Sequence, residues 1–460
     1  MKAESNNKSK LSIFYLSSLT TRLTIVYFGV SIGIALQIGA ANWDIIWHGV
    51  TDVESFFTPP HTVLYSGVAL TIGSIFIGII QYVRLRETEG EKEKEKEKEH
   101  VQQPLADKPS ELTTTKESLS KSLGDVRQSS PSSSSLLTSL HCLIQTLFKM
   151  PYPIKLVAIG TIIEIFSGGF DSWWHYNFGF DGLLSPPHLM LTIGMLTSVF
   201  GALIGIFKLL QNNNYGNNSK NILLKISFIV SYAVAWIVTV NTIFMFSLPY
   251  SKGQYFDFNP NPFAAIFIAT IAIPFVSGII FYSAAKTLRD VHFRFTFITL
   301  AFMIIHSTAT IISNNHFAIL YPLYLLNIIP ALTADIIISS KRKRKRYYEK
   351  EKSTAVERKH LGNAHSLSVR QRAETSDLMG KQMIVIFCSA LVPVFFITLF
   401  FPWSVNAYKE FFGIDMNTFE SIAIFNRLLW PFIIPFVIPV SILISTFGCY
   451  IMSRILGKLL

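Results

Sequence analysis

The chain has 460 residues, half of them hydrophobic, and only 15% carry a charged side chain. The charges fall into a few blocks separated by long uncharged stretches, a composition typical of a membrane protein and not of a soluble domain. The formal net charge of +11 would suit nucleic acid, but the basic residues flank apolar segments. We therefore expect the lipid bilayer as the partner and exclude nucleic acid.

Apolar runs of about 20 residues are long enough to cross a bilayer as helices. About ten such runs follow one another along the chain, at residues 22–42, 61–83, 154–170, 188–207, 222–247, 263–285, 295–312, 316–339, 383–403 and 429–452. The sequence thus predicts an all-α polytopic membrane protein with about ten transmembrane helices.

Two polar segments interrupt the apolar runs. Glu-Lys alternation from Glu91 to Glu99 and the serines from Ser129 to Ser135 cannot bury a core, and this composition is typical of a disordered linker. The expected units are a membrane hairpin (1–85), a disordered cytoplasmic linker (86–150), a second membrane hairpin (151–210), helices five to eight (211–340), a basic cytoplasmic tether (341–380) and helices nine and ten (381–460).

The basic residues predict the orientation. If the spans alternate, Lys and Arg next to spans one, two, four and eight and at the end of the chain all lie on one side. The positive-inside rule makes that side the cytoplasm. We expect an integral, multi-pass plasma-membrane protein with both termini in the cytoplasm.

A motif occurs twice at the outer ends of the first four spans. Both copies read Asp-x3-His-x12-His, with the last His behind a Pro-Pro pair. The residues are Asp44, His48 and His61 in the first copy and Asp171, His175 and His188 in the second. The offset that relates Asp44 to Asp171 also superposes about forty further positions without a gap, which indicates a duplicated two-helix hairpin at the N-terminal end of the chain.

The spacing brings each set of three side chains together. Asp and His four residues apart share one helix face. Pro-Pro suits a helix start and places the second His at the top of the next span. One carboxylate and two imidazoles therefore converge at the mouth of each hairpin.

Three interpretations account for such a set. Asp and His can form a structural clasp, since Asp hydrogen-bonds His and the second His caps its helix. They can bind copper, zinc or non-haem iron and leave coordination positions open for water or substrate. They can also titrate in a proton or solute pathway without any metal.

The motif resembles the copper-ligand pattern in the C subunit of particulate methane and ammonia monooxygenases. The resemblance covers only the Asp-x3-His-x12-His segment of each copy. It implies copper ligands at Asp44, His48 and His61 and at Asp171, His175 and His188, and a site close to oxidation chemistry. The duplication, the tryptophans, the Pro-Pro pairs and the ten-span length depart from that family.

Further residues lie within reach of the motifs. Glu164 is two turns below Asp171 on the same helix face, its counterpart in the first copy is Gln37, and either can be a second partner of the site or a proton relay. Trp47 and Trp174 either join an aromatic belt or wall the site from water. His306 and His316 lie at the same expected depth, where interhelical hydrogen bonds or ligation would suit them. Asn241 and Met245 repeat the Asp-His spacing without its ligands.

These observations predict an integral membrane metalloprotein with two Asp/His/His sites at the extracytoplasmic membrane face. Copper is favoured over zinc or iron, in redox chemistry or copper handling, and whether the protein is an enzyme stays open. A proton- or cation-coupled transporter or channel is the first alternative. A structural subunit that assembles with other membrane subunits is the second.

Overall fold

The computed structural model describes residues 2–50, 57–101, 150–179, 184–213, 222–245, 262–288, 291–313, 328–340 and 434–459, with single positions between 383 and 432. For residues 2–19, 85–101 and several other helical positions, His48 among them, it describes the backbone alone. Within this part of the chain every regular element is a helix, and short turns connect or flank the helices.

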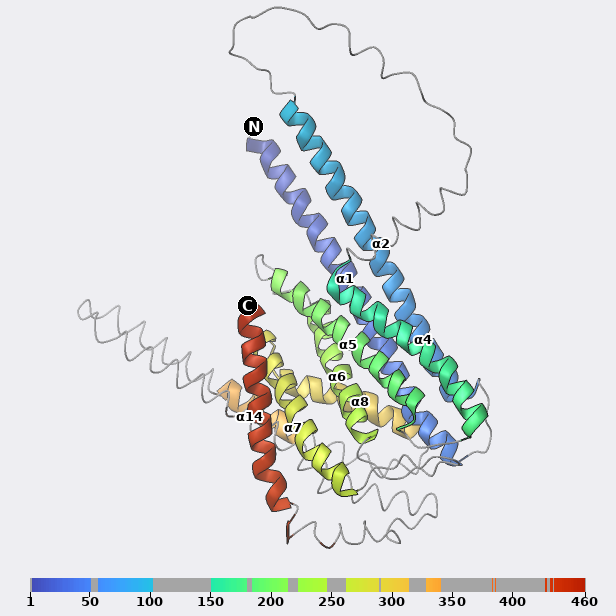
Figure 1. The fold of residues 1–460 in the computed structure, drawn as a ribbon. Coiled ribbons are helices and arrows are strands. Elements are labelled where there is room, and N and C mark those ends of the chain that lie inside the picture. Colours follow the sequence, from blue (N-terminus) through green and yellow to red (C-terminus); the bar gives the residue numbers. More distant parts are fainter. Residues whose placement is uncertain are drawn as a thin grey trace, which may run out of the picture.

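Four helices form two antiparallel hairpins (Figure 1). The first pairs α1 (Lys2–Val50) with α2 (Pro59–Val101), and the second pairs α4 (Tyr152–Phe178) with α5 (Pro186–Asn213). Both second helices begin at their Pro-Pro pair, as predicted, because proline has no amide hydrogen to lose in a first turn.

The remaining helices pack around these hairpins. They are α6 (Ile222–Met245), α7 (Pro262–Thr287), α8 (Arg294–Ser313), a further helix Ile328–Ser340 and α14 (Ile434–Leu459). Helix α6 contacts α1, α5, α7 and α8, so it lies at the centre of the bundle. Its Trp236 and Phe228 are among the largest fully buried side chains, and Ser231 bonds Ser31 of α1 at 2.6 Å.

Among the residues that the structure describes, seven helices are long and apolar enough to cross a membrane. They agree with expected spans one to six and ten, whereas spans seven and eight appear as the shorter apolar helices Arg294–Thr308 and Ile328–Ser340. The expected ninth span, 383–403, lies almost wholly outside the described residues. A multi-pass membrane protein is therefore indicated, and the count of ten stays a prediction.

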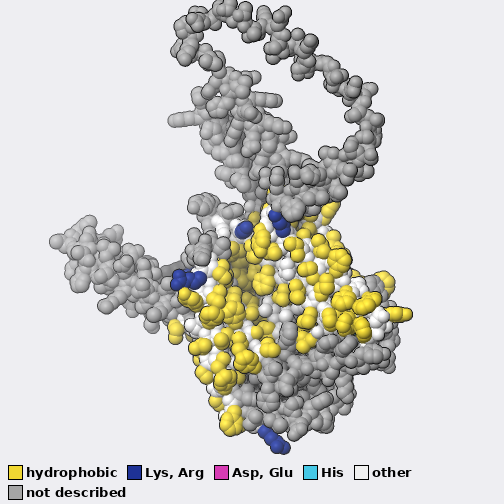
Figure 2. Space-filling model, viewed as in Figure 1, with side chains coloured by type: hydrophobic (Ala, Val, Ile, Leu, Met, Phe, Trp, Pro, Cys, Tyr) yellow, Lys and Arg dark blue, Asp and Glu magenta, His cyan; other side chains and the backbone are white. Residues whose placement is uncertain are grey.

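The outer surface of these helices suits lipid. Large apolar side chains such as Phe76, Phe166 and Leu443 are more than 60% exposed. Figure 2 shows this apolar surface, with most of the visible Lys and Arg side chains toward the end from which α1 and α2 project. The N-terminal end of α1 and the C-terminal end of α14 lie at the same end of the bundle (Figure 1). The side of the membrane that this end faces remains a prediction.

The structure corrects one boundary. Helix α2 continues to Val101, so the first part of the segment 86–150 is helical and not disordered linker. Glu and Lys both have high helix propensity, and a helix already formed across the membrane removes the cost of nucleation. The tether 341–380 and residues 102–149 lie outside the described part.

Glycines set the distance between the helices of each hairpin. A Cβ atom on Gly67 would lie 2.6 Å from the Gly33 carbonyl oxygen, and one on Gly194 would lie 2.9 Å from that of Gly160. These positions correspond at the offset that relates the two motif copies. Small residues thus bring the two backbones of each hairpin together in the same way.

Substitution of one of these glycines tests the packing. We expect Gly67→Ala to lower the stability of the detergent-purified protein by about 1–3 kcal/mol, because the added methyl meets backbone in a close-packed interface. Gly73→Ala is the control on the same helix, since its Cβ would meet nothing within 4 Å. Thermal unfolding measures both, and equal midpoints for the two variants would contradict this account.

Candidate metal centre

The end of α4 positions two of the three residues of the second motif. Asp171 and His175 lie one turn apart on its last turns. Gly179 then ends the helix with φ of 67°, a left-handed conformation that glycine adopts without strain, and its N–H bonds the His175 carbonyl at 2.9 Å. The turn carries the Gly179 carbonyl back to the His175 ring, 3.2 Å from Nδ1.

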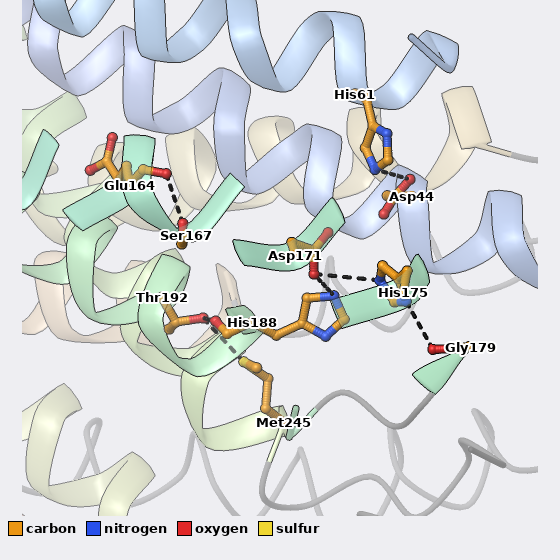
Figure 3. A network of polar contacts seen from close by, with 10 residues as sticks. All are labelled: Asp44, His61, Glu164, Ser167, Asp171, His175, Gly179, His188, Thr192 and Met245. Atoms are coloured by element: carbon orange, nitrogen blue, oxygen red, sulfur yellow. Dashed lines mark hydrogen bonds and ion pairs between the residues drawn. The ribbon is translucent and has the colours of Figure 1, made fainter. Parts of the chain in front are cut away.

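The start of α5 positions the third residue. Pro186 and Pro187 open the helix, and the Leu189 N–H closes its first turn on the Ser185 carbonyl at 3.0 Å. This register turns His188 toward α4, where its Nε2 lies 3.3 Å from Asp171 Oδ1. The structure therefore brings Asp171, His175 and His188 together (Figure 3).

The spacing of these atoms fits an ion between them. His175 Nε2 lies 3.4 Å from the same Asp171 Oδ1, and one ligand atom from each of the three residues lies within 4.8 Å of the others. Nitrogen and oxygen ligands at about 2.0–2.1 Å from a tetrahedral ion are about 3.3–3.4 Å apart. This group can hold a metal ion after small side-chain movements.

The protonation of His175 follows from its contact with Gly179. A carbonyl oxygen only accepts, so Nδ1 donates the hydrogen and, in the neutral ring, Nε2 carries a lone pair. That atom faces Asp171 Oδ1, and it donates a hydrogen bond to the carboxylate only if the imidazole is protonated on both nitrogens. Two acceptors at 3.4 Å repel each other unless a proton or a metal cation lies between them.

The first hairpin repeats part of this geometry. His61 Nε2 lies 3.3 Å from Asp44 Oδ1, and both side chains are 18% exposed. Thr58 caps α2 here, because its Oγ1 accepts the His61 N–H at 3.4 Å. The His48 side chain lies outside the described residues, so the third ligand of this set stays a prediction.

The two sets lie close to each other. The Asp44 and Asp171 carboxylates interact electrostatically, and both interact with the Tyr65 hydroxyl. Tyr65 follows His61 by one turn on α2, with the two ring centroids 6.0 Å apart. Sequence reasoning missed Tyr65, although its spacing from His61 would have placed it on the motif's helix face.

The other predicted residues lie away from the three ligands. Glu164 accepts a hydrogen bond from Ser198 and interacts with Gln37 in the hairpin interface, deeper in the bundle than Asp171 (Figure 3). The Trp174 ring packs on Phe170 and Phe178, with centroids 5.8 and 4.7 Å away, so aromatic packing accounts for its position. Trp47 is half-buried near the end of α1.

The predicted residues of the later helices lie at different places in the structure. His306 is buried and stacks on Phe302 with ring centroids 5.8 Å apart, and it is not among the described residues that can share an ion. Met245 lies next to the second hairpin, because its sulfur accepts a hydrogen bond from Thr192 at 3.3 Å. Asn241 donates to Asn42 of α1 at 3.3 Å. His316 lies outside the described part.

Comparison with known proteins gives no relative on which to base a function. No protein-family model matches the chain, and neither the curated proteins nor the solved structures contain a significantly similar one.

Replacement of one ligand tests the site. We expect His188→Ala to weaken Co²⁺ binding by about ten-fold or more, because the ion loses one of three protein ligands. His292→Ala is the control, since His292 lies just before α8 and far along the chain from the motifs. Absorption of the bound Co²⁺ in the purified full-length protein measures the affinity. Equal binding by both variants would contradict the assignment.

Proposed function

We propose that the chain is an integral membrane metalloprotein that binds copper at the ends of its first two hairpins, for redox chemistry or copper handling. The observation that carries the proposal is that His175 Nε2 and His188 Nε2 both face one oxygen of the Asp171 carboxylate, while the Gly179 carbonyl lies against His175 Nδ1. A cation between these atoms removes the repulsion that the metal-free arrangement contains.

The ligand set supports a functional site more than a purely structural one. Structural metal sites in proteins close four ligands around the ion, whereas three protein ligands leave a position for water or substrate. The hydrogen bond from His175 to the Gly179 carbonyl is the kind of outer contact that fixes the tautomer and orientation of a metal-ligating imidazole.

The position of Met245 supports copper over zinc or iron. The hydroxyl of Thr192, one turn after His188, lies 2.8 Å from the His188 carbonyl oxygen and 3.3 Å from the Met245 sulfur, the two acceptors that its one hydrogen can reach. A thioether is a soft ligand that suits Cu⁺ and has little affinity for zinc in an oxygen and nitrogen site. Imidazole ligands suit Cu²⁺, so a site in which Met245 also reached the ion would suit both oxidation states.

We further propose that the hairpins are a duplicated unit and bind one ion each. Corresponding residues make corresponding contacts: Asp44 with His61 and Asp171 with His188, both at 3.3 Å. The electrostatic interaction between the two Asp carboxylates supports neighbouring sites, since positive ions would offset their repulsion.

Elemental analysis of the protein purified without chelators tests this proposal. We expect about two equivalents of copper, from one complete ligand set in each hairpin. His175→Ala should remove one equivalent and His61→Ala the other, because each variant breaks a different set. Loss of all copper from either variant would instead show a single shared site. Folded wild-type protein that is free of metal under copper-replete growth would contradict the proposal.

The role of Met245 has its own test. We expect Met245→Leu to weaken Cu⁺ binding by about ten-fold while Zn²⁺ binding stays the same, because leucine keeps the volume and removes the sulfur. Competition with a coloured Cu⁺ chelator measures the first and a fluorescent zinc indicator the second. Equal losses for both ions would mean that Met245 acts by packing alone.

The transporter is the second candidate, and Glu164 is the observation that favours it. A carboxyl group in the interior of a membrane bundle is costly and marks an ion or proton pathway in many transport proteins. Asp335 is the other acid among the buried residues that the structure describes, and its helix-capping contacts explain its burial without a transport role. Its Oδ2 accepts from Thr296 N and Oγ1, both at 2.8 Å, and so caps α8.

A further inference from the structure

Glu164 and Gln37 occupy the interface between the two hairpins. Both are buried, and their side chains interact with each other. The two residues occupy corresponding positions at the offset that relates the motif copies. Their glycine contacts correspond as well: a Cβ on Gly194 would lie 2.7 Å from Glu164 Cγ, and a Cβ on Gly67 would lie 2.7 Å from Gln37 Cγ. Corresponding residues that touch each other lie on the axis that would relate the hairpins.

A second pair of contacts has the same symmetry. A Cβ on Gly78 of the first hairpin would lie 3.8 Å from Ile154 of the second. The corresponding Gly205 of the second hairpin approaches Tyr27 of the first, and Tyr27 corresponds to Ile154. The contacts are reciprocal, as they are across a two-fold axis, so the hairpins face each other with Gln37 and Glu164 between them.

The hydrogen bonds made by Glu164 and Gln37 leave one side-chain oxygen of each residue without a partner among the described residues. Ser198 Oγ donates to Glu164 Oε1 at 2.7 Å, and Gln37 Nε2 donates to Thr71 Oγ1 at 3.5 Å. Glu164 Oε2 and Gln37 Oε1 are buried and have no hydrogen-bond partner in the described part of the chain. Both atoms are acceptors when the carboxyl is ionised, so neither can satisfy the other.

We infer that Glu164 and Gln37 form a proton-binding site between the hairpins, in which the neutral Glu164 carboxyl donates the hydrogen on Oε2 to Gln37 Oε1. One proton gives both orphaned oxygens a partner and removes a charge from an apolar interior. The site lies two turns, about 10 Å, from Asp171 on α4. It does not rest on metal binding, because no metal ligand takes part in it.

A proton suits this cluster better than a hard metal cation. Such cations take about six or more oxygen ligands, whereas the side chains here are Glu164, Gln37, Ser198 and Thr71. The hydroxyl oxygens of Ser198 and Thr71 are already engaged in hydrogen bonds with Glu164 and Gln37, so few oxygen atoms are left to bind a cation. The groups that face Glu164 are uncharged: Gln37 from α1, Ser198 from α5, and Ser167 of α4, which donates to the Glu164 backbone carbonyl at 2.7 Å.

The two hairpins differ at this position, with Gln37 in the first and Glu164 in the second, and this difference sets how many protons the site can bind. The first copy carries an amide where the second carries an acid, so the pair holds one exchangeable proton and not two. Two carboxyls on the axis would share a proton between like charges, and two amides would hold no titratable proton. Exchange at Glu164 would give the bundle a proton carrier between the Asp/His residues and the opposite membrane face.

Infrared spectroscopy of the full-length protein tests the inference. We expect the carbonyl stretch of a neutral carboxylic acid that shifts in heavy water, disappears in Glu164→Gln, and persists both after treatment with a chelator and in Asp171→Asn. Glu164→Gln copies the residue that the first hairpin already tolerates, so the variant is expected to fold. A wild-type spectrum without this band at mildly acidic pH, or a band that Glu164→Gln leaves unchanged, would overturn the site.

Two further measurements separate a proton from other occupants. Gln37→Leu removes the acceptor, so the Glu164 carbonyl stretch should move to higher frequency while the band remains. Sodium or potassium at constant pH should leave the band unchanged. Loss of the band on addition of either cation would show a cation site and overturn the proton assignment. A band that is insensitive to Gln37→Leu would overturn the pairing with Gln37.

Discussion

Close backbone contact between the two helices of each hairpin is the constraint on which the described site depends. Gly33 and Gly67 in the first hairpin, and Gly160 and Gly194 in the second, leave no room for a Cβ atom at the contact. Helices this close place the last turn of one beside the first turn of the next. The Asp residue on one helix and the His residue on the other can then approach within 3.3 Å.

The same packing explains why polar side chains persist inside an apolar bundle. Ser198 and Thr71 follow the contact glycines Gly194 and Gly67 by one turn, where their hydroxyls reach Glu164 and Gln37. Hydroxyls next to glycines are typical of membrane-helix interfaces, where small residues admit the neighbouring backbone and provide hydrogen bonds. The helix contacts of each hairpin therefore position both the Asp and His residues at its end and the Glu164–Gln37 pair deeper in the bundle.

The proposed metal site and the proposed proton site lie at two depths of the helix bundle. At the hairpin ends, Asp171, His175 and His188 present donor atoms at spacings that suit an ion. Deeper, Glu164 and Gln37 present two acceptors that need one hydrogen. Redox reactions at one membrane face often take up or release protons, and under the redox proposal the Glu164 carboxyl below the Asp and His residues would suit that role. The copper chemistry and the proton exchange remain separate proposals, since each has its own ligands.

The sequence by itself determined the helical membrane class and the six Asp and His candidates, because apolar length and i, i+4 spacing are local properties. It also predicted the helix starts at Pro59 and Pro186. It did not predict the helix through the Glu-Lys segment, where charge alternation was taken for disorder although both residues favour helix. Only the tertiary structure decided which polar groups meet, since those contacts join residues far apart in the chain. It brought Tyr65 near the two carboxylates and placed Glu164 against Gln37 across the hairpin interface.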